Sequence, residues 1–160
     1  MLKEIGIMQG RLLPKFKGRY QAHPLGYWKD EFLIAKNLGL NYIEFILDYN
    51  DFEQNPLIFE SGINEIINII QTTNVGVKSI CADYFMEAPL HSSNKDIAKK
   101  SVDMLNKLII SADKIGVTDI VIPCVDQSSL MMEVDKKRLI INLIGFSELG
   151  LSSFNGIISY

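Results

Sequence analysis

Residues 37–47 read NLGLNYIEFIL, in which a helix ends at a glycine and a short apolar strand follows. The same arrangement returns as NVGVKSICA at residues 74–82 and KIGVTDIVIP at residues 114–123, and more faintly as ELGLSSFNGII at residues 148–158. A glycine suits the left-handed residue that ends a helix, which predicts that role for Gly39, Gly76, Gly116 and Gly150. The runs after the glycines are nearly continuous in apolar character, as in strands buried on both faces.

Helical stretches lie between these strands. Trp28, Phe32 and Ala35 follow the period of an amphipathic helix, and Asn94 is placed to cap a longer one. A last helix is predicted to begin at Asp135, and an apolar run at residues 5–8 opens the chain as a strand. The order is therefore βαβαβαβα with a terminal strand after it, which implies a parallel sheet.

The connections differ in length on the two sides of the predicted sheet. Each link from a helix to a strand is a glycine and a residue or two, whereas the links from strands to helices are long. The long links cover residues 10–27, 48–60, 83–93 and 125–134. Because such loops follow the carboxyl ends of parallel strands, where ligands bind in this class of fold, they mark the expected functional face.

Two architectures fit this order of elements: a barrel of (β/α) repeats and a complete doubly wound sheet of the flavodoxin-like kind. Gly10 and Gly18 are too far apart to form a phosphate-binding loop after the first strand, and no acidic cluster with a partner lysine follows the receiver pattern. The sequence therefore favours a partial barrel of about four units, a half-barrel, and leaves the open sheet as the alternative.

The composition is that of an ordinary globular protein. Of the 160 residues 48% are hydrophobic and 22% charged, and the net charge of −3 argues against a nucleic-acid binder that relies on overall positive charge. No apolar run approaches a membrane span, and the N-terminus lacks the layout of a secretory signal. Cys81 and Cys124 lie in apolar runs, as expected for buried reduced thiols. We expect a cytoplasmic protein with no nucleic-acid or membrane partner.

Candidate ligand-binding residues follow the first strand. Gln9 and Arg11 come directly after it, and Arg11, Lys15, Lys17 and Arg19 form a positive stretch that contains no acid. Arginine offers a planar fork that fits phosphate or carboxylate, so this stretch is a candidate anion clamp. A solvated loop is the favoured interpretation for Lys15 and Lys17, whereas Arg11 is assigned to substrate binding.

Acidic candidates mark the later strands. Glu44 lies inside a strand, where a carboxylate is costly unless paired; a catalytic acid or base and a structural partner for Arg11 both stay open. Asp83 and Tyr84 end the third strand and Asp126 follows the fourth, which makes them candidates for binding sugar hydroxyls. The two histidines, at positions 23 and 91, fall in no recognised metal-ligand spacing.

Three segments resemble the N-terminal half of the sugar phosphate isomerase/epimerase family, the xylose-isomerase-like TIM barrels. They read IGIMQGRLLP, YQAHPLGYWKDEFLIAKNLGLNYIEF and SICADYFMEAPL. The run from MQGRL through WKDEF to GLNYIEF is the most specific part, and the resemblance fades after residue 134. It implies an isomerase or epimerase acting on sugars or sugar phosphates. In that chemistry a divalent metal (manganese, magnesium or zinc) polarises a carbonyl and hydroxyl pair while two carboxylates move a proton.

The sequence departs from the family where the metal ligands belong, on the fifth and later strands. No Asp, Glu or His follows Glu148, and Asn155 and Gly156 stand at the strand-end positions. We expect residues 1–160 to form one incomplete barrel domain with an atypical tail from about residue 147. It would bind a sugar or sugar phosphate, hold no metal and be inactive alone. A truncated product, which the tail favours, a half-barrel that pairs with another copy through its open edges, and a degenerate binding module all stay open.

Overall fold

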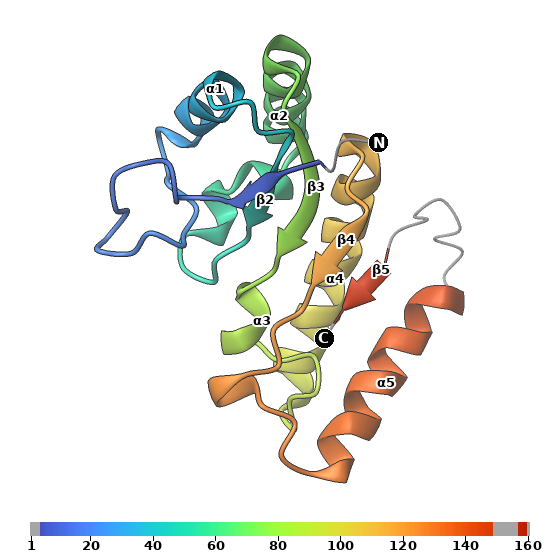
Figure 1. Cartoon of the computed structure of the whole chain (residues 1–160). Coiled ribbons are helices and arrows are strands. Elements are labelled where there is room, and N and C mark those ends of the chain that lie inside the picture. The colour runs from blue at the N-terminus through green and yellow to red at the C-terminus, as the bar shows by residue number, and fades with distance from the viewer. Residues whose placement is uncertain (1–3, 149–156, 160) are drawn as a thin grey trace.

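The structure is a computed structural model that describes residues 4–148 and 157–159. A curved parallel sheet runs through it, and the long helices lie along the sheet (Figure 1). The strands are β1 (Gly6–Met8), β2 (Tyr42–Ile46), β3 (Gly76–Cys81), β4 (Asp119–Val121) and β5 (Ile157–Ser159). The α-helices are α1 (Trp28–Asn37), α2 (Glu60–Thr73), α3 (Tyr84–Glu87), α4 (Lys95–Ile115) and α5 (Glu133–Glu148). Short 3-10 turns are η1 (Phe52–Gln54), η2 (Pro56–Ile58) and η3 (Asp126–Ser128).

The order of the strands decides between the two predicted architectures. The strands lie side by side in chain order, β1-β2-β3-β4-β5, and each neighbouring pair is parallel. A doubly wound sheet reverses direction at a switch point and has an order such as 2-1-3-4-5. The sequential order is that of a barrel cut open, so the predicted partial (β/α) barrel is confirmed and the open-sheet alternative is wrong.

The ends of the helices are set by capping residues. The side-chain oxygen of Asn94 accepts a hydrogen bond from the Asp96 N–H at 2.9 Å, which caps α4 as predicted. Gly39 and Gly116 take the left-handed conformation, with φ of +73° and +76°. Gly76 does not: Asn74 ends α2 with φ of +60°, and Gly76 already belongs to β3. Asparagine tolerates this conformation because its short polar side chain can bond locally, so the repeat motif misled the prediction here.

Two other predictions about element ends have different outcomes. The last long helix begins at Glu133, one half-turn before the predicted Asp135, whose side chain accepts a hydrogen bond from the Met132 N–H at 3.0 Å. The expected terminal strand is present as β5, paired with β4. The helix end predicted at Gly150 and the strand-end positions Asn155 and Gly156 lie outside the described residues.

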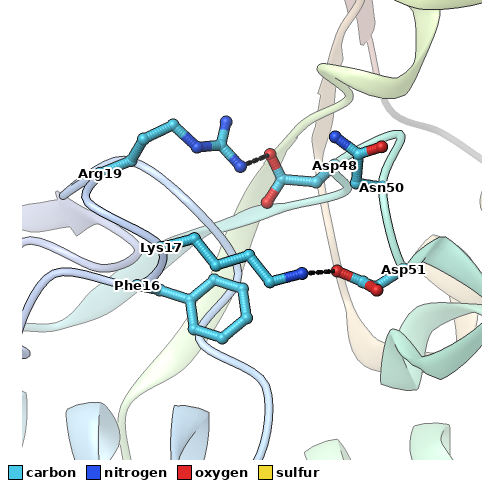
Figure 2. Close-up of a pocket in the computed structure, with 6 residues that line it drawn as sticks. All are labelled: Phe16, Lys17, Arg19, Asp48, Asn50 and Asp51. Atoms are coloured by element: carbon cyan, nitrogen blue, oxygen red, sulfur yellow. Dashed lines mark hydrogen bonds and ion pairs between the residues drawn. The ribbon is translucent and has the colours of Figure 1, made fainter.

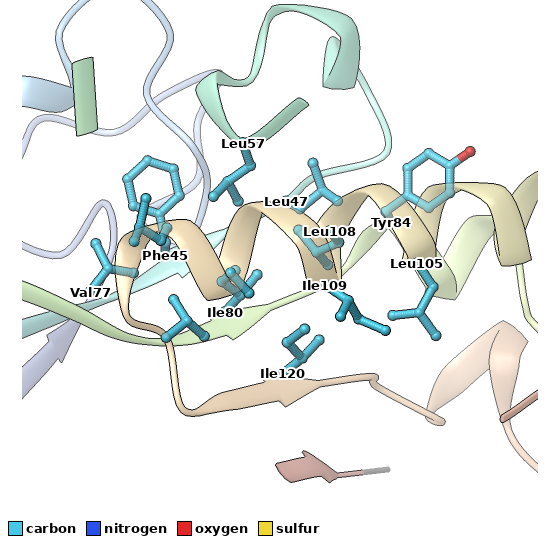
Figure 3. Packing of buried hydrophobic residues seen from close by; sticks show 14 of the residues in the cluster. Phe45, Leu47, Leu57, Val77, Ile80, Tyr84, Leu105, Leu108, Ile109 and Ile120 are labelled. Carbon is cyan, nitrogen blue, oxygen red and sulfur yellow. The ribbon is translucent and has the colours of Figure 1, made fainter. Parts of the chain in front are cut away.

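The core lies between the helices and one face of the sheet. Ile43, Phe45, Val77, Ile80 and Ile120 point from the strands into this layer and are almost completely buried. Figure 3 shows the last four of these side chains together with Leu105, Leu108 and Ile109 of α4 and with Leu47 and Leu57, which follow β2. Each such side chain contributes about 1.5–3 kcal/mol by leaving water. This burial fixes which face of each strand is left for other tasks.

The other face of the sheet is called the inner face, because it would line the inside of a closed barrel. It carries Tyr42, Glu44, Ser79 and Asp119, all only partly buried. The register shifts between β2 and β3: Ile43 pairs with Val77, but Glu44 pairs with Ser79 rather than with Lys78. None of the described helices combines the length and apolar character that a bilayer span requires.

Candidate functional site

The long loops meet at the carboxyl edge of the sheet. In the loop after β1, a tight turn pairs Phe16 with Arg19, and the Lys17 ammonium at its tip forms an ion pair with Asp51. Figure 2 shows the side chains of this turn facing those of the loop after β2. The two loops line a pocket of about 390 Å³. The residues that line the pocket are Phe16, Lys17, Arg19, Asp48, Asn50 and Asp51.

A cluster of polar side chains lies beside this pocket and is called the carboxyl-edge cluster (Arg19, Asp48, Cys81 and Asp83). The Arg19 guanidinium donates to one Asp48 oxygen at 3.0 Å, and the His23 backbone N–H donates to the other at 2.8 Å. The Cys81 thiol donates to Asp83 at 3.1 Å. The cluster therefore joins the loop after β1 to the ends of β2 and β3.

The environment of the cluster shifts the pKa values of two of its side chains, Asp83 and Cys81. Burial raises the pKa of the Asp83 carboxyl, and the charge of Asp48 adds to that rise, while the Cys81 hydrogen bond and the Arg19 charge oppose it. The pKa of the Cys81 thiol is raised by burial and by the neighbouring carboxylates, so the sulfur stays protonated and is no nucleophile. A half-buried carboxyl with a raised pKa beside a cleft can exchange a proton or bind a hydroxyl.

Glu44 lies on the inner face, below the carboxyl edge. Its carboxylate accepts a hydrogen bond from the Ser79 hydroxyl at 2.9 Å and lines a cavity of about 160 Å³ between β1, β2 and β3. The Arg11 guanidinium, the structural partner considered for Glu44, instead donates to the Gln21 side chain at 3.4 Å. Glu44 therefore faces a space that a ligand or another part of a barrel can reach.

Gln9 differs from the other candidates in being completely buried. Its oxygen accepts a hydrogen bond from the Ile46 N–H at 3.0 Å and another from His23 Nδ1 at 3.2 Å. Gln9 Nε2 and His23 Nε2 are buried without a partner among the described residues. In this arrangement Gln9 ties β1 to the end of β2 and to the loop that covers it.

The remaining two candidates are Tyr84 and Asp126, and neither has a side-chain hydrogen bond to the carboxyl-edge cluster among the described residues. Tyr84 is buried in α3, where its ring packs against Tyr49 and Phe52 with centroids 5.2 Å away in each case. Asp126 begins η3 with φ of +50° and is exposed to solvent. The structure thus brings Asp83 into the cluster and places Glu44 below it, while the carboxylate of Asp126 stays on the outer rim.

Glu31 holds the loop after β1, a role that the sequence analysis did not assign to it. The carboxylate is fully buried and accepts hydrogen bonds from the Gly10 N–H at 2.8 Å and the Leu12 N–H at 3.0 Å. Gly10 has φ of +86°, and a Cβ there would lie 2.0 Å from the Tyr20 carbonyl oxygen, so only glycine fits. The missed signal was an acid on the apolar stripe of α1, three residues after Trp28.

The described residues do not fit a metal centre. Among residues 4–148 and 157–159, no group of three or more His, Cys, Asp or Glu side chains is placed to hold an ion. Both oxygens of Asp48 already accept hydrogen bonds, and His23 is buried beneath the loop with its Nδ1 bonded to the Gln9 side chain. No chemical step is therefore assigned to a metal held by these residues.

A comparison with models of protein families finds no match. Individual curated proteins, however, match part of the chain in sequence. A probable L-ribulose-5-phosphate 3-epimerase from Mycoplasma pneumoniae is 29% identical over 91 residues, which are 56% of this chain and 30% of that protein. The L-ribulose-5-phosphate 3-epimerase UlaE of Escherichia coli is 26% identical over 99 residues, 61% of this chain and 35% of that protein. The chain therefore matches about a third of the length of these curated relatives.

Solved structures match the fold over almost the whole chain. A D-psicose 3-epimerase from Clostridium cellulolyticum superposes with a TM-score of 0.71 at 15% identity, covering 98% of this chain and 51% of that one. The IolI protein, solved with a bound zinc atom, gives a TM-score of 0.65 at 15% identity over 50% of its length. In sequence and fold the chain therefore resembles the sugar phosphate isomerase/epimerase family of xylose-isomerase-like TIM barrels, over a span consistent with the N-terminal half of a barrel.

Proposed function

We propose that this chain supplies the sugar-binding half of a sugar phosphate isomerase or epimerase site. The substrate class is a ketopentose phosphate, the class named in the curated relatives. In this proposal residues 1–160 form one incomplete barrel domain. The divalent metal and its ligands come from the other half of a barrel. The chain therefore does not turn over substrate alone. The observation that carries the proposal is the carboxyl-edge cluster, since it lies where barrels of this class bind ligands.

The chemistry of the cluster suits a polyhydroxylated ligand. Ionised carboxylates accept hydrogen bonds from sugar hydroxyls, and a carboxyl with a raised pKa can also donate one. Asp83 is only partly buried and one of its oxygens contacts the Cys81 thiol, whereas both oxygens of Asp48 already accept a hydrogen bond. Asp83 is therefore the proposed sugar ligand at the edge, and Glu44 the proposed acid or base deeper on the inner face.

The basic loop offers a place for the phosphate group. Lys17 and Arg19 are neutralised by Asp51 and Asp48. Arg11 and Lys15 take part in no ion pair within the part of the chain that the structure describes, and the Lys15 ammonium lies 4.8 Å from the centre of the Tyr20 ring. The proposed phosphate clamp is therefore Arg11, with its exposed guanidinium, assisted by Lys15.

The sugar assignment predicts a specific loss of binding. Asp83→Asn keeps an oxygen for the Cys81 thiol but removes the charge, and we expect it to weaken binding of ribulose 5-phosphate about tenfold. Isothermal titration calorimetry measures the effect. Asp103→Asn, at an exposed position on α4, is the matched control and should leave the affinity within about a factor of two. Equal affinities for the two variants and the unaltered chain would remove Asp83 from the site.

The second expected outcome concerns whether the chain alone forms a complete catalytic site. We expect the chain alone, supplied with manganese, to give no epimerisation of ribulose 5-phosphate in a coupled assay and to retain no stoichiometric metal after gel filtration. A pairing half-barrel is the second candidate, because β1 and β5 lie at the two edges of the sheet and unpaired strand edges favour association. Sedimentation of the same sample separates the two candidates, since a dimer supports pairing. Turnover together with one bound metal per chain would contradict the assignment of the metal ligands to the other half.

A further inference from the structure

Another cavity lies between the start of α4 and the middle of α5. Its volume is about 550 Å³, larger than the pocket beside the cluster. Eight residues line it, and they include three cations and no acid. The polar members are Ser92, Ser93, Lys95, Lys99, Arg138 and Asn142. This cavity is called the α4–α5 groove.

Helix geometry places the cations of the groove opposite one another. Lys95 and Lys99 are one turn apart on α4, and Arg138 and Asn142 are one turn apart on α5, so each pair shares a face of its helix. The Asn142 amide donates to the Leu90 carbonyl at 2.6 Å, which fastens α5 to the loop that carries Ser92 and Ser93. The fold therefore holds the α4 pair and the α5 pair on opposite sides of the cavity, although the cations in them repel each other.

The positive charge of the groove is only partly neutralised. Arg138 lies 3.4 Å from the Asp135 carboxylate one turn earlier on α5. Within residues 4–148 and 157–159, Lys95 and Lys99 take part in no ion pair, although Lys17, Lys29, Lys78, Lys114 and Lys136 do. Two like charges one turn apart on a helix repel each other, so their placement costs stability that a bound anion would return.

The groove also contains donors that suit phosphate oxygens. The Ser92 oxygen accepts a hydrogen bond from the Asn94 N–H at 3.2 Å, which leaves its own proton available to donate. Ser93, the next residue in the chain, also lines the cavity. The amino end of α4 adds little, because the Asn94 side chain already accepts from the Asp96 N–H and Asp96 places a negative charge there. The site therefore rests on the three cations and two hydroxyls.

We propose that the α4–α5 groove binds the phosphate group of a phosphorylated small molecule. Three cations from two helices surround a space that holds a phosphate with several further heavy atoms, and the hydroxyls complete the set of donors. The groove shares no lining residue with the pocket beside the carboxyl-edge cluster. It is a second anion site, independent of the proposed sugar site.

The test titrates the ¹⁵N-labelled chain with inorganic phosphate, with ribulose 5-phosphate and with unphosphorylated ribulose, following the amide signals of residues 92–99 by NMR. Both phosphates are expected to shift these signals and ribulose is not. The double variant Lys95→Gln/Lys99→Gln should weaken phosphate binding about tenfold or more. Its control, Lys100→Gln/Lys107→Gln, removes the same charge from the same helix outside the groove and should bind within about a factor of two of the unaltered chain.

Each result decides the proposal. Shifts with ribulose 5-phosphate alone, abolished by Lys95→Gln/Lys99→Gln, support the groove and identify the small molecule rather than free phosphate as its ligand. Shifts with ribulose as strong as with its phosphate, equal losses in the two double variants, or no shift with either phosphate overturn it. Asp83→Asn should leave the groove signals unchanged, so failure of the sugar site and failure of the groove are separately visible.

Discussion

The fold is expected to lose stability steadily as the pH falls from 6.5 towards 3, because His23 must stay neutral in it. Burial lowers the pKa of His23 from 6.5 to about 3. Below pH 6.5 the unfolded chain therefore binds a proton at this position that the folded chain does not. The free energy of unfolding falls by up to about 1.4 kcal/mol for each pH unit across this window, and the loss is complete near the folded pKa.

The surroundings of His23 explain why the proton is excluded. Its ring lies 5.3 Å from that of Phe45 and 6.2 Å from that of Trp28, and only 3% of the residue is exposed. Nδ1 donates to the Gln9 oxygen, so Nε2 is the nitrogen that would accept the proton, and no described residue is placed to pair with it. The nearby carboxylate of Asp48 is bound to the His23 backbone N–H and to Arg19.

Replacing His23 tests this acid sensitivity directly. His23→Phe keeps an aromatic ring between Phe45 and Trp28 and removes the titrating group, so urea unfolding should show a flatter dependence on pH. His91→Gln is the control, since burial lowers the pKa of His91 but the charge of Asp135 offsets part of that effect. It should change the slope less than His23→Phe does. Parallel curves for His23→Phe and the unaltered chain would show that another group causes the acid loss.

Glu31→Ala should be among the most destabilising single changes in the chain. It leaves the Gly10 and Leu12 N–H groups buried without an acceptor and empties the space of the carboxylate. An orphaned buried donor costs about 1–3 kcal/mol, so two of them predict a loss of about 3 kcal/mol in the free energy of unfolding. Urea denaturation measures it, and hydrogen exchange at Gly10 and Leu12 should accelerate with it.

Asp30→Ala gives the matched control for that experiment. Asp30 precedes Glu31 in the first turn of α1 but is exposed, so its removal costs only the favourable charge at the helix start, about 0.3–1 kcal/mol. If the two variants unfold at the same urea concentration, the carboxylate of Glu31 does not hold the loop as described. Faster exchange at Gly10 alone would limit its role to one hydrogen bond.

The sequence predicted the fold where the signal was local and repeated. Apolar runs after glycines located β2, β3 and β4, and the side-chain cap at Asn94 located the start of α4. The strand order could not be predicted from these runs, because barrel and doubly wound sheets use the same units in a different sequence of neighbours. Gly76 shows the limit of the motif, since the neighbouring Asn74 takes the conformation assigned to it.

The site was predicted less well than the fold, for a physical reason. Residue type and position placed Asp83 after a strand and Glu44 within one, and the one partner considered, Arg11 for Glu44, bonds the Gln21 side chain instead. The pairing of Arg19 with Asp48 joins residues 29 positions apart, and the contact of Glu31 with Gly10 joins residues 21 apart. Such contacts depend on how loops fold back, which no local pattern records. Glu31 is the exception, because an acid on the apolar stripe of α1 is a signal that the sequence itself contains.

The register shift between β2 and β3 determines how much negative charge the inner face offers. Without it, Glu44 would stand opposite Lys78, and the two would cancel each other's charge in an ion pair. The extra residue in β3 instead sets the neutral hydroxyl of Ser79 against Glu44, while the Lys78 ammonium lies 3.9 Å from the Glu4 carboxylate at the far end of the sheet. The absence of a cation opposite the Glu44 carboxylate is therefore a property of how the backbones of β2 and β3 are aligned.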